Sequence, residues 1–113
     1  MAVYVVNLII DQGVDFSQTF NLESTSTDAA LNLTGYTGAS QLRKHSGSKS
    51  SYQFTVTFPD RENGQIKLAL SDNITNRIKP GRYIYDVILT SSGGLKERVV
   101  EGSVLVREGA TKE

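Results

Sequence analysis

Hydrophobic and polar residues alternate along most of the chain, and no segment keeps the 3.6-residue period of an amphipathic helix. The clearest alternation covers residues 52–58, where every second residue is aromatic or aliphatic and the others are Gln or Thr. Residues 14–22 repeat the pattern, with Val14 and Phe16 in the same phase as Phe20. Alternation of this kind predicts half-buried β-strands, with one side chain row facing a core.

Turn sequences divide these strands at regular intervals. Asn63-Gly64 is the tip of one predicted turn, Lys79 to Gly81 forms a second, and residues 71–78 leave room for one short helical turn. About seven short strands separated in this way predict an immunoglobulin-like antiparallel β-sandwich. A small closed barrel is the alternative architecture. We expect a single domain over residues 1–107 and a polar tail over residues 108–113.

The last two predicted strands form a hairpin whose register depends on its turn. A two-residue turn at Gly93-Gly94 places Tyr85 opposite Gly102, where an aromatic ring covers exposed backbone. The same register sets Asp86 against Glu101, which is unfavourable, and a turn centred one residue earlier would avoid that pair. Either Tyr83 or Tyr85 is placed to form the tyrosine corner of immunoglobulin-like domains.

Composition removes several classes of function. The chain of 113 residues has no cysteine, so it has no disulfide framework and no Cys-based zinc or thiol chemistry. Twelve basic and twelve acidic residues cancel, which is not the charge expected of a protein that binds nucleic acid or an anionic membrane. No window approaches the roughly 20 apolar residues of a membrane span. The apolar N-terminus lacks the basic flank and cleavage site of a signal peptide.

The polar residues show no catalytic or metal-binding pattern. His45 is the only histidine, lies in a Ser- and Gly-rich segment, and has no neighbouring carboxylate to orient it as a base. Residues 47–50 lack the glycines that a phosphate-binding loop requires. Asp60, Glu62 and Asn63 lack the spacing of a calcium loop and are typical turn formers. We therefore expect no catalytic residue, no metal site, no cofactor and no small-molecule substrate.

The strongest unexplained feature is a surplus of apolar residues on two strands. Near the N-terminus and in the final hairpin, aliphatic residues occupy the phase opposite to the predicted core row, where a solvated face would be polar. Exposure at strand ends or cover by a loop would also account for them. We favour a protein–protein interface. Its candidate residues are Val3, Val5, Ile9, Ile84, Ile88, Val99 and Leu105.

Several segments, in this order and spacing, resemble the small immunoglobulin-like domains of tailed-bacteriophage virion proteins. They are residues 13–17, 33–37 with 41–44, 81–87 and 101–106. The chain is similar in style to the N-terminal domain of phage baseplate upper proteins and to small virion proteins of phages that infect cyanobacteria. That family implies a structural role in a tail, baseplate, fibre or neck, and it supplies no catalytic residues. Baseplate upper proteins continue into further domains, so an adaptor or decoration subunit is the expectation here.

The sequence thus predicts a non-enzymatic virion structural protein, made in the host cytoplasm. Its expected partners are other virion proteins or copies of itself, with no nucleic acid or membrane involved. The alternative is a carbohydrate-binding module for attachment to the host surface. Tyr36, Tyr52, Tyr83 and Tyr85 would be its platform, although all four share the phase of core positions and there is no tryptophan. An enzyme is a more remote alternative.

Overall fold

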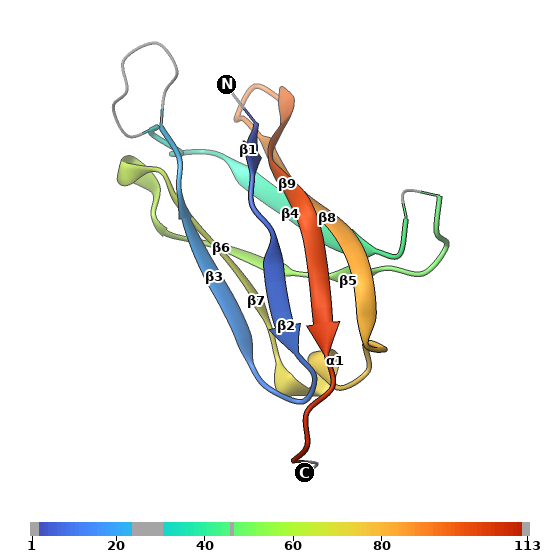
Figure 1. Cartoon of the computed structure of the whole chain (residues 1–113). Coiled ribbons are helices and arrows are strands. Elements are labelled where there is room, and N and C mark those ends of the chain that lie inside the picture. The colour runs from blue at the N-terminus through green and yellow to red at the C-terminus, as the bar shows by residue number, and fades with distance from the viewer. Residues whose placement is uncertain (1–2, 24–30, 46, 112–113) are drawn as a thin grey trace.

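The computed structural model describes residues 3–23, 31–45 and 47–111. The predicted tail is therefore described only as far as Thr111. Two β-sheets face each other across one core, and they do not close into a barrel (Figure 1). The predicted sandwich is confirmed and the barrel alternative is wrong.

Sheet A has six strands. Their bounds, in spatial order with β1 and β2 sharing one edge, are β1 (Tyr4–Val5), β2 (Leu8–Asp11), β9 (Lys96–Arg107), β8 (Gly81–Thr90), β4 (Thr37–Arg43) and β5 (Tyr52–Gln53). Sheet B has three strands, β3 (Phe16–Asn21), β7 (Gln65–Leu70) and β6 (Thr55–Asp60). A 3₁₀ turn, η1 (Arg61–Asn63), and a short helix, α1 (Asp72–Thr75), complete the described elements.

The strand order follows immunoglobulin topology. The division into β3-β7-β6 and β4-β8-β9 corresponds to the two sheets of that fold. The N-terminal strand departs from an all-antiparallel sandwich, because β1 and β2 both pair in parallel with β9 (Figure 1). Tyr83 forms the predicted tyrosine corner: its hydroxyl donates to the Lys79 carbonyl oxygen over 2.7 Å.

Residues 52–58 do not form one continuous strand. β5 pairs with β4 in sheet A, whereas β6 pairs with β7 in sheet B, so the chain changes sheets at Phe54. The Phe54 side chain is buried at this crossing, with ring centroids 5.9 Å from Phe16 and 6.1 Å from Tyr85. Its inward phase is confirmed, and the ring contacts aromatic side chains of both sheets.

Val14 is a correction to the predicted core row. It is 56% exposed, because it lies in the turn after β2, where its N–H bonds the Asp11 carbonyl oxygen, and β3 starts only at Phe16. The alternation of strand side chains applies only inside a strand. Phe20 and Leu22 face the core as predicted.

The final hairpin combines two registers. Far from the turn, Tyr85 pairs with Gly102 and Asp86 with Glu101, as a Gly93-Gly94 turn predicts. The turn itself is one residue longer, since the Ser91 N–H bonds the Leu95 carbonyl oxygen. A β-bulge between these regions, at Val99, absorbs the extra residue.

Candidate protein interface

The outward side of sheet A carries branched aliphatic side chains. Along β8 they alternate with the buried row that includes Tyr83, Tyr85 and Val87, and along β2 and β9 they alternate with other core residues. We call this set the apolar face: Val5, Ile9, Ile84, Ile88 and Leu105. Val5 is 73% exposed, Ile9 55% and Ile84 44%, whereas Ile88 and Leu105 are half-buried. Val3 is exposed just before β1.

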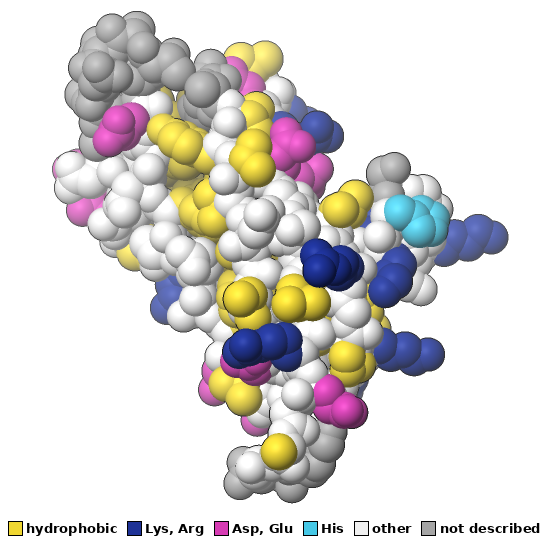
Figure 2. All heavy atoms as spheres, in the orientation of Figure 1, with side chains coloured by type: hydrophobic (Ala, Val, Ile, Leu, Met, Phe, Trp, Pro, Cys, Tyr) yellow, Lys and Arg dark blue, Asp and Glu magenta, His cyan; other side chains and the backbone are white. Residues whose placement is uncertain are grey.

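Strand register arranges these residues in rows across the sheet. One row runs Val5, Glu101, Asp86, Gln41 and Gln53. A second row runs Ile9, Leu105 and Arg82, and between the two rows Ser103 pairs with Ile84. Figure 2 shows hydrophobic surface over the region of β1, β2 and β9, with basic side chains beside it. The structure therefore brings predicted residues from four strands, β1, β2, β8 and β9, onto one face.

Val99 does not belong to this face. It is fully buried, as is its neighbour Val100, because the bulge turns two successive side chains toward the core. Simple alternation had placed Val99 outward. Its apolar character is explained by packing inside the sandwich, so the prediction of an interface role for Val99 is wrong.

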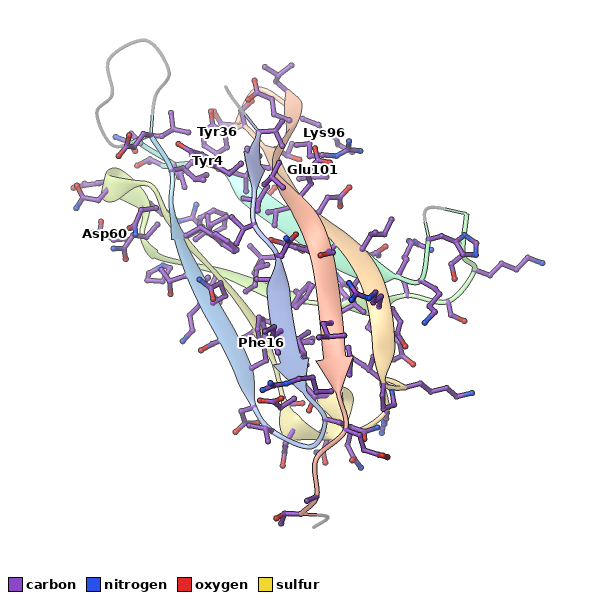
Figure 3. All side chains as sticks on the ribbon, in the orientation of Figure 1. Tyr4, Phe16, Tyr36, Asp60, Lys96 and Glu101 are labelled. Atoms are coloured by element: carbon purple, nitrogen blue, oxygen red, sulfur yellow. The ribbon has the colours of Figure 1, made fainter. Side chains whose placement is uncertain are left out.

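A shallow depression of about 470 Å³ lies in the middle of the face. Its lining combines an apolar floor with charges of both signs: Gln41, Arg43, Ile84, Tyr85, Asp86, Arg98, Glu101 and Gly102. Asp86 and Glu101 stand side by side, as the predicted register requires, and Arg98 offsets their repulsion with an ion pair to Asp86 at 3.2 Å. Glu101 is labelled on β9 in Figure 3.

Arg43 is held in place by its own loop. Its guanidinium donates to the Ser48 carbonyl oxygen over 2.7 Å and to the Gln41 side chain oxygen over 2.8 Å. The side chains of Arg82 and Glu101, by contrast, form no hydrogen bond or ion pair within the described part of the chain. The face thus presents the cation of Arg82 and the anion of Glu101, neither of which has an ion-pair partner within the described residues.

Two hydrogen bonds that involve side chains hold the segment between β1 and β2 against β8 and β9. The Tyr85 hydroxyl donates to the Val6 carbonyl oxygen over 2.6 Å, and the Ser103 N–H donates to Asn7 Oδ1 over 3.1 Å. Gly102 permits this approach, because a Cβ there would collide with the Val6 carbonyl oxygen. Burial raises the pKa of Tyr85 to about 12. The register predicted the Tyr85–Gly102 pair but gave no sign that the segment between β1 and β2 lies against it.

At the β2 end of the face, Asp11 and Arg107 form an exposed ion pair of 2.8 Å. The hydrogen bond from the guanidinium lowers the pKa of Asp11 and raises that of Arg107. Exposed pairs of this type contribute little to stability. This ion pair lies at the edge of the apolar face.

The residues considered for chemistry are dispersed. His45 is exposed in the loop after β4, and Asn63 donates to the Asp60 carboxylate over 2.6 Å within a turn. Within residues 3–23, 31–45 and 47–111, no group of three or more His, Asp or Glu is placed to hold a metal ion. No helix in the same ranges is long and apolar enough to cross a membrane.

None of the nine aromatic side chains is exposed, and all nine lie in the described ranges. Tyr83 and Tyr85 are buried, and Tyr36 and Tyr52 are half-buried, with the Tyr52 hydroxyl on the Arg77 carbonyl oxygen at 3.2 Å. In Figure 3 Tyr4 extends from β1 toward β3, where its hydroxyl accepts the Glu23 N–H at 3.3 Å. An exposed aromatic platform would have favoured the carbohydrate-binding alternative, and these side chains do not form one.

No family model matches the chain, and no curated protein matches it. Among solved structures, the N-terminal domain of phage TP901-1 ORF48 is similar to it, with a TM-score of 0.57 and 14% identity, over 95% of this chain and 99% of that domain. A Listeria monocytogenes internalin-like protein gives a TM-score of 0.46 at 12% identity, covering 95% of this chain and 28% of the other. A structure from photo-crosslinking analyses of multimeric cell-adhesive interactions of VGSC beta subunits gives 0.45 at 13%, covering 95% and 93%. The similarity to the phage domain is one of fold, across nearly the whole of both chains.

Proposed function

We propose that this chain is a non-enzymatic structural protein of a tailed bacteriophage virion, an adaptor or decoration subunit that acts through protein–protein contacts. The observation that carries the proposal is the apolar face on the outward side of sheet A. Exposed aliphatic residues gathered on one face of a small domain can mark a surface that another protein covers. The fold similarity to a phage domain and the resemblance of segments 13–17 and 81–87 to virion proteins support the phage context.

The chemistry of this surface suits adhesion. Val5, Ile9 and Ile84 offer apolar area, whose burial contributes about 25 cal/mol per Å². The charges of Asp86, Glu101 and nearby arginines surround that area, as polar groups surround the apolar centre of many interfaces. Such a surface binds by shape and burial and needs no catalytic group.

Purified phage particles from the source of the chain provide the test. We expect mass spectrometry to find the chain in the particles, and immobilised chain to capture an identified virion protein or another copy of itself. The variant Val5→Thr/Ile9→Thr should lose this capture. The matched control Val14→Thr/Leu95→Thr removes equally exposed aliphatic residues from turns and should keep it. A chain that is absent from the particles and remains a monomer without virion partners contradicts the proposal.

A further inference from the structure

The outward row of β8 is arranged symmetrically about Ile84. Arg82 lies two residues before Ile84 and Asp86 two residues after it, so opposite charges stand at equal distances on either side of an exposed aliphatic side chain. Residues two apart on a strand lie about 6–7 Å apart on the same face. A second copy turned end for end over this face would therefore meet each charge with its opposite.

The edge of the sheet has the same spacing. Val5 lies in the row of Asp86, and Ile9 lies in the row of Arg82. A two-fold axis through Ile84, in the plane of the face and perpendicular to the strands, exchanges these two rows. It places Val5 against Ile9 of the other copy in the same operation that places Asp86 against Arg82. The same two-fold axis thus pairs opposite charges and pairs apolar residues.

The other face-to-face arrangement is disfavoured by charge. A two-fold axis parallel to the strands sets each row against itself: an axis through Ile84 places Asp86 against Asp86 of the other copy, and an axis between β8 and β9 places Asp86 against Glu101. Like charges juxtaposed across an interface oppose association. With the perpendicular axis, the unpaired Arg82 approaches this acidic pair.

From this complementarity we propose that the apolar face binds a second copy of the chain, as an antiparallel, face-to-face dimer with Ile84 on the two-fold axis. The inference rests on the proposed function in taking the apolar face as an interface, and it names the partner. A two-fold interface is self-complementary, with each contact made twice. The aligned packing of two sheets is also compatible with strands that run in opposite directions.

Two charge-reversal variants test the symmetry. In Arg82→Glu homodimers the introduced glutamate of each copy meets Asp86 of the other, and in Asp86→Arg homodimers the introduced arginine meets Arg82. Each variant alone should therefore dimerise at least about 10-fold more weakly than the unmodified chain. In the mixed dimer the introduced glutamate meets the introduced arginine, and Arg82 of one chain meets Asp86 of the other. Sedimentation velocity on an equimolar mixture should therefore show more dimer than either variant forms alone.

Lys67→Glu on the outward side of sheet B is the matched control and should leave dimerisation unchanged. Melting temperatures of all variants show that each is folded. A monomeric unmodified chain, or a mixture that remains as monomeric as its components, overturns the inference. If such chains still bind an identified virion protein, the dimer is wrong while the proposed function stands; if they are also absent from virions, both are wrong.

Discussion

The two outward faces of this sandwich are built from the same kind of strand but from different side chains. On sheet B the outward residues are small or polar apart from Pro59: Ser17, Thr19, Asn21, Thr55, Thr57, Gln65, Lys67 and Ala69. On sheet A the corresponding positions include Val5, Ile9, Ile84, Ile88 and Leu105. Sheet B therefore has the alternation expected of a sheet with one face in water, and sheet A does not.

This contrast separates what the fold requires from what it does not. Both sheets supply inward side chains to one core, which includes Leu8 and Val104 from sheet A and Ile66 and Leu68 from sheet B. The core of the sandwich thus needs no aliphatic residue on either outward face. Sheet B shows that threonine and other polar residues suffice there. The proposed covering partner would account for the aliphatic residues of sheet A.

A large-to-small substitution in the core between the two sheets should have the largest effect on stability. We expect Phe54→Ala to lower the free energy of unfolding by about 3–5 kcal/mol, because it empties a buried site where the chain passes from one sheet to the other. Denaturant unfolding measures the change. Association per folded molecule should remain unaltered, since Phe54 is remote from the outward faces. A loss under about 1 kcal/mol would contradict the central role of Phe54.

Alkaline pH should lower the free energy of unfolding, with the next largest effect. Burial raises the pKa of Tyr85 from 10.0 to about 12, so between these values the unfolded chain loses the phenol proton while the folded chain keeps it. Stability from this group is therefore complete below about pH 10 and declines by about 2–3 kcal/mol as the pH rises to about 12. Urea unfolding from pH 8 to 12 measures the decline.

The variant Tyr85→Phe isolates this contribution. It lacks the ionisable hydroxyl and the hydrogen bond to Val6, so it should be less stable at pH 8 but lose less stability above pH 10. Burial also raises the pKa of Tyr83. The control Tyr83→Phe should therefore still show the loss of stability above pH 10 that comes from Tyr85. Equal pH dependence in Tyr85→Phe and the unmodified chain would show that Tyr85 does not govern it.

Sequence patterns were sufficient where side chain phase is set by regular strands. The sandwich, the far register of the hairpin and most of the apolar face followed from alternation and turn residues, whereas the tyrosine corner was left open between Tyr83 and Tyr85. Val99 and Val14 were misplaced because a bulge and a turn each interrupt the two-residue period. The parallel pairing of β1 and β2 with β9 was missed for another reason. Alternation shows which side of a strand is buried, and it does not show which strand lies beside it.

Replacing aliphatic residues of the apolar face with threonine, as found on the outward side of sheet B, should have a smaller effect. It should weaken association more than it weakens folding. In the double variant Ile84→Thr/Ile88→Thr the β-branched strand residues are kept but apolar area is removed. Since both side chains are already partly covered, the loss on association should be about 1–2 kcal/mol in total. Melting temperature and sedimentation of the same sample measure both effects. A collapse of the melting temperature with unchanged association would assign these residues to the core.

The reverse exchange should have the smallest effect. Thr19 and Thr57 flank Lys67 in one outward row of sheet B, and Thr19→Val/Thr57→Val adds aliphatic surface there without altering branching. We expect the free energy of unfolding to change by less than about 0.5 kcal/mol, as for most surface substitutions, and association to stay as it was. Sheet B lacks the paired rows of charge and aliphatic residues that give sheet A its complementarity. If this variant associates as strongly as the unmodified chain does through sheet A, apolar area alone drives binding, and the arrangement of Arg82, Ile84 and Asp86 has no special role.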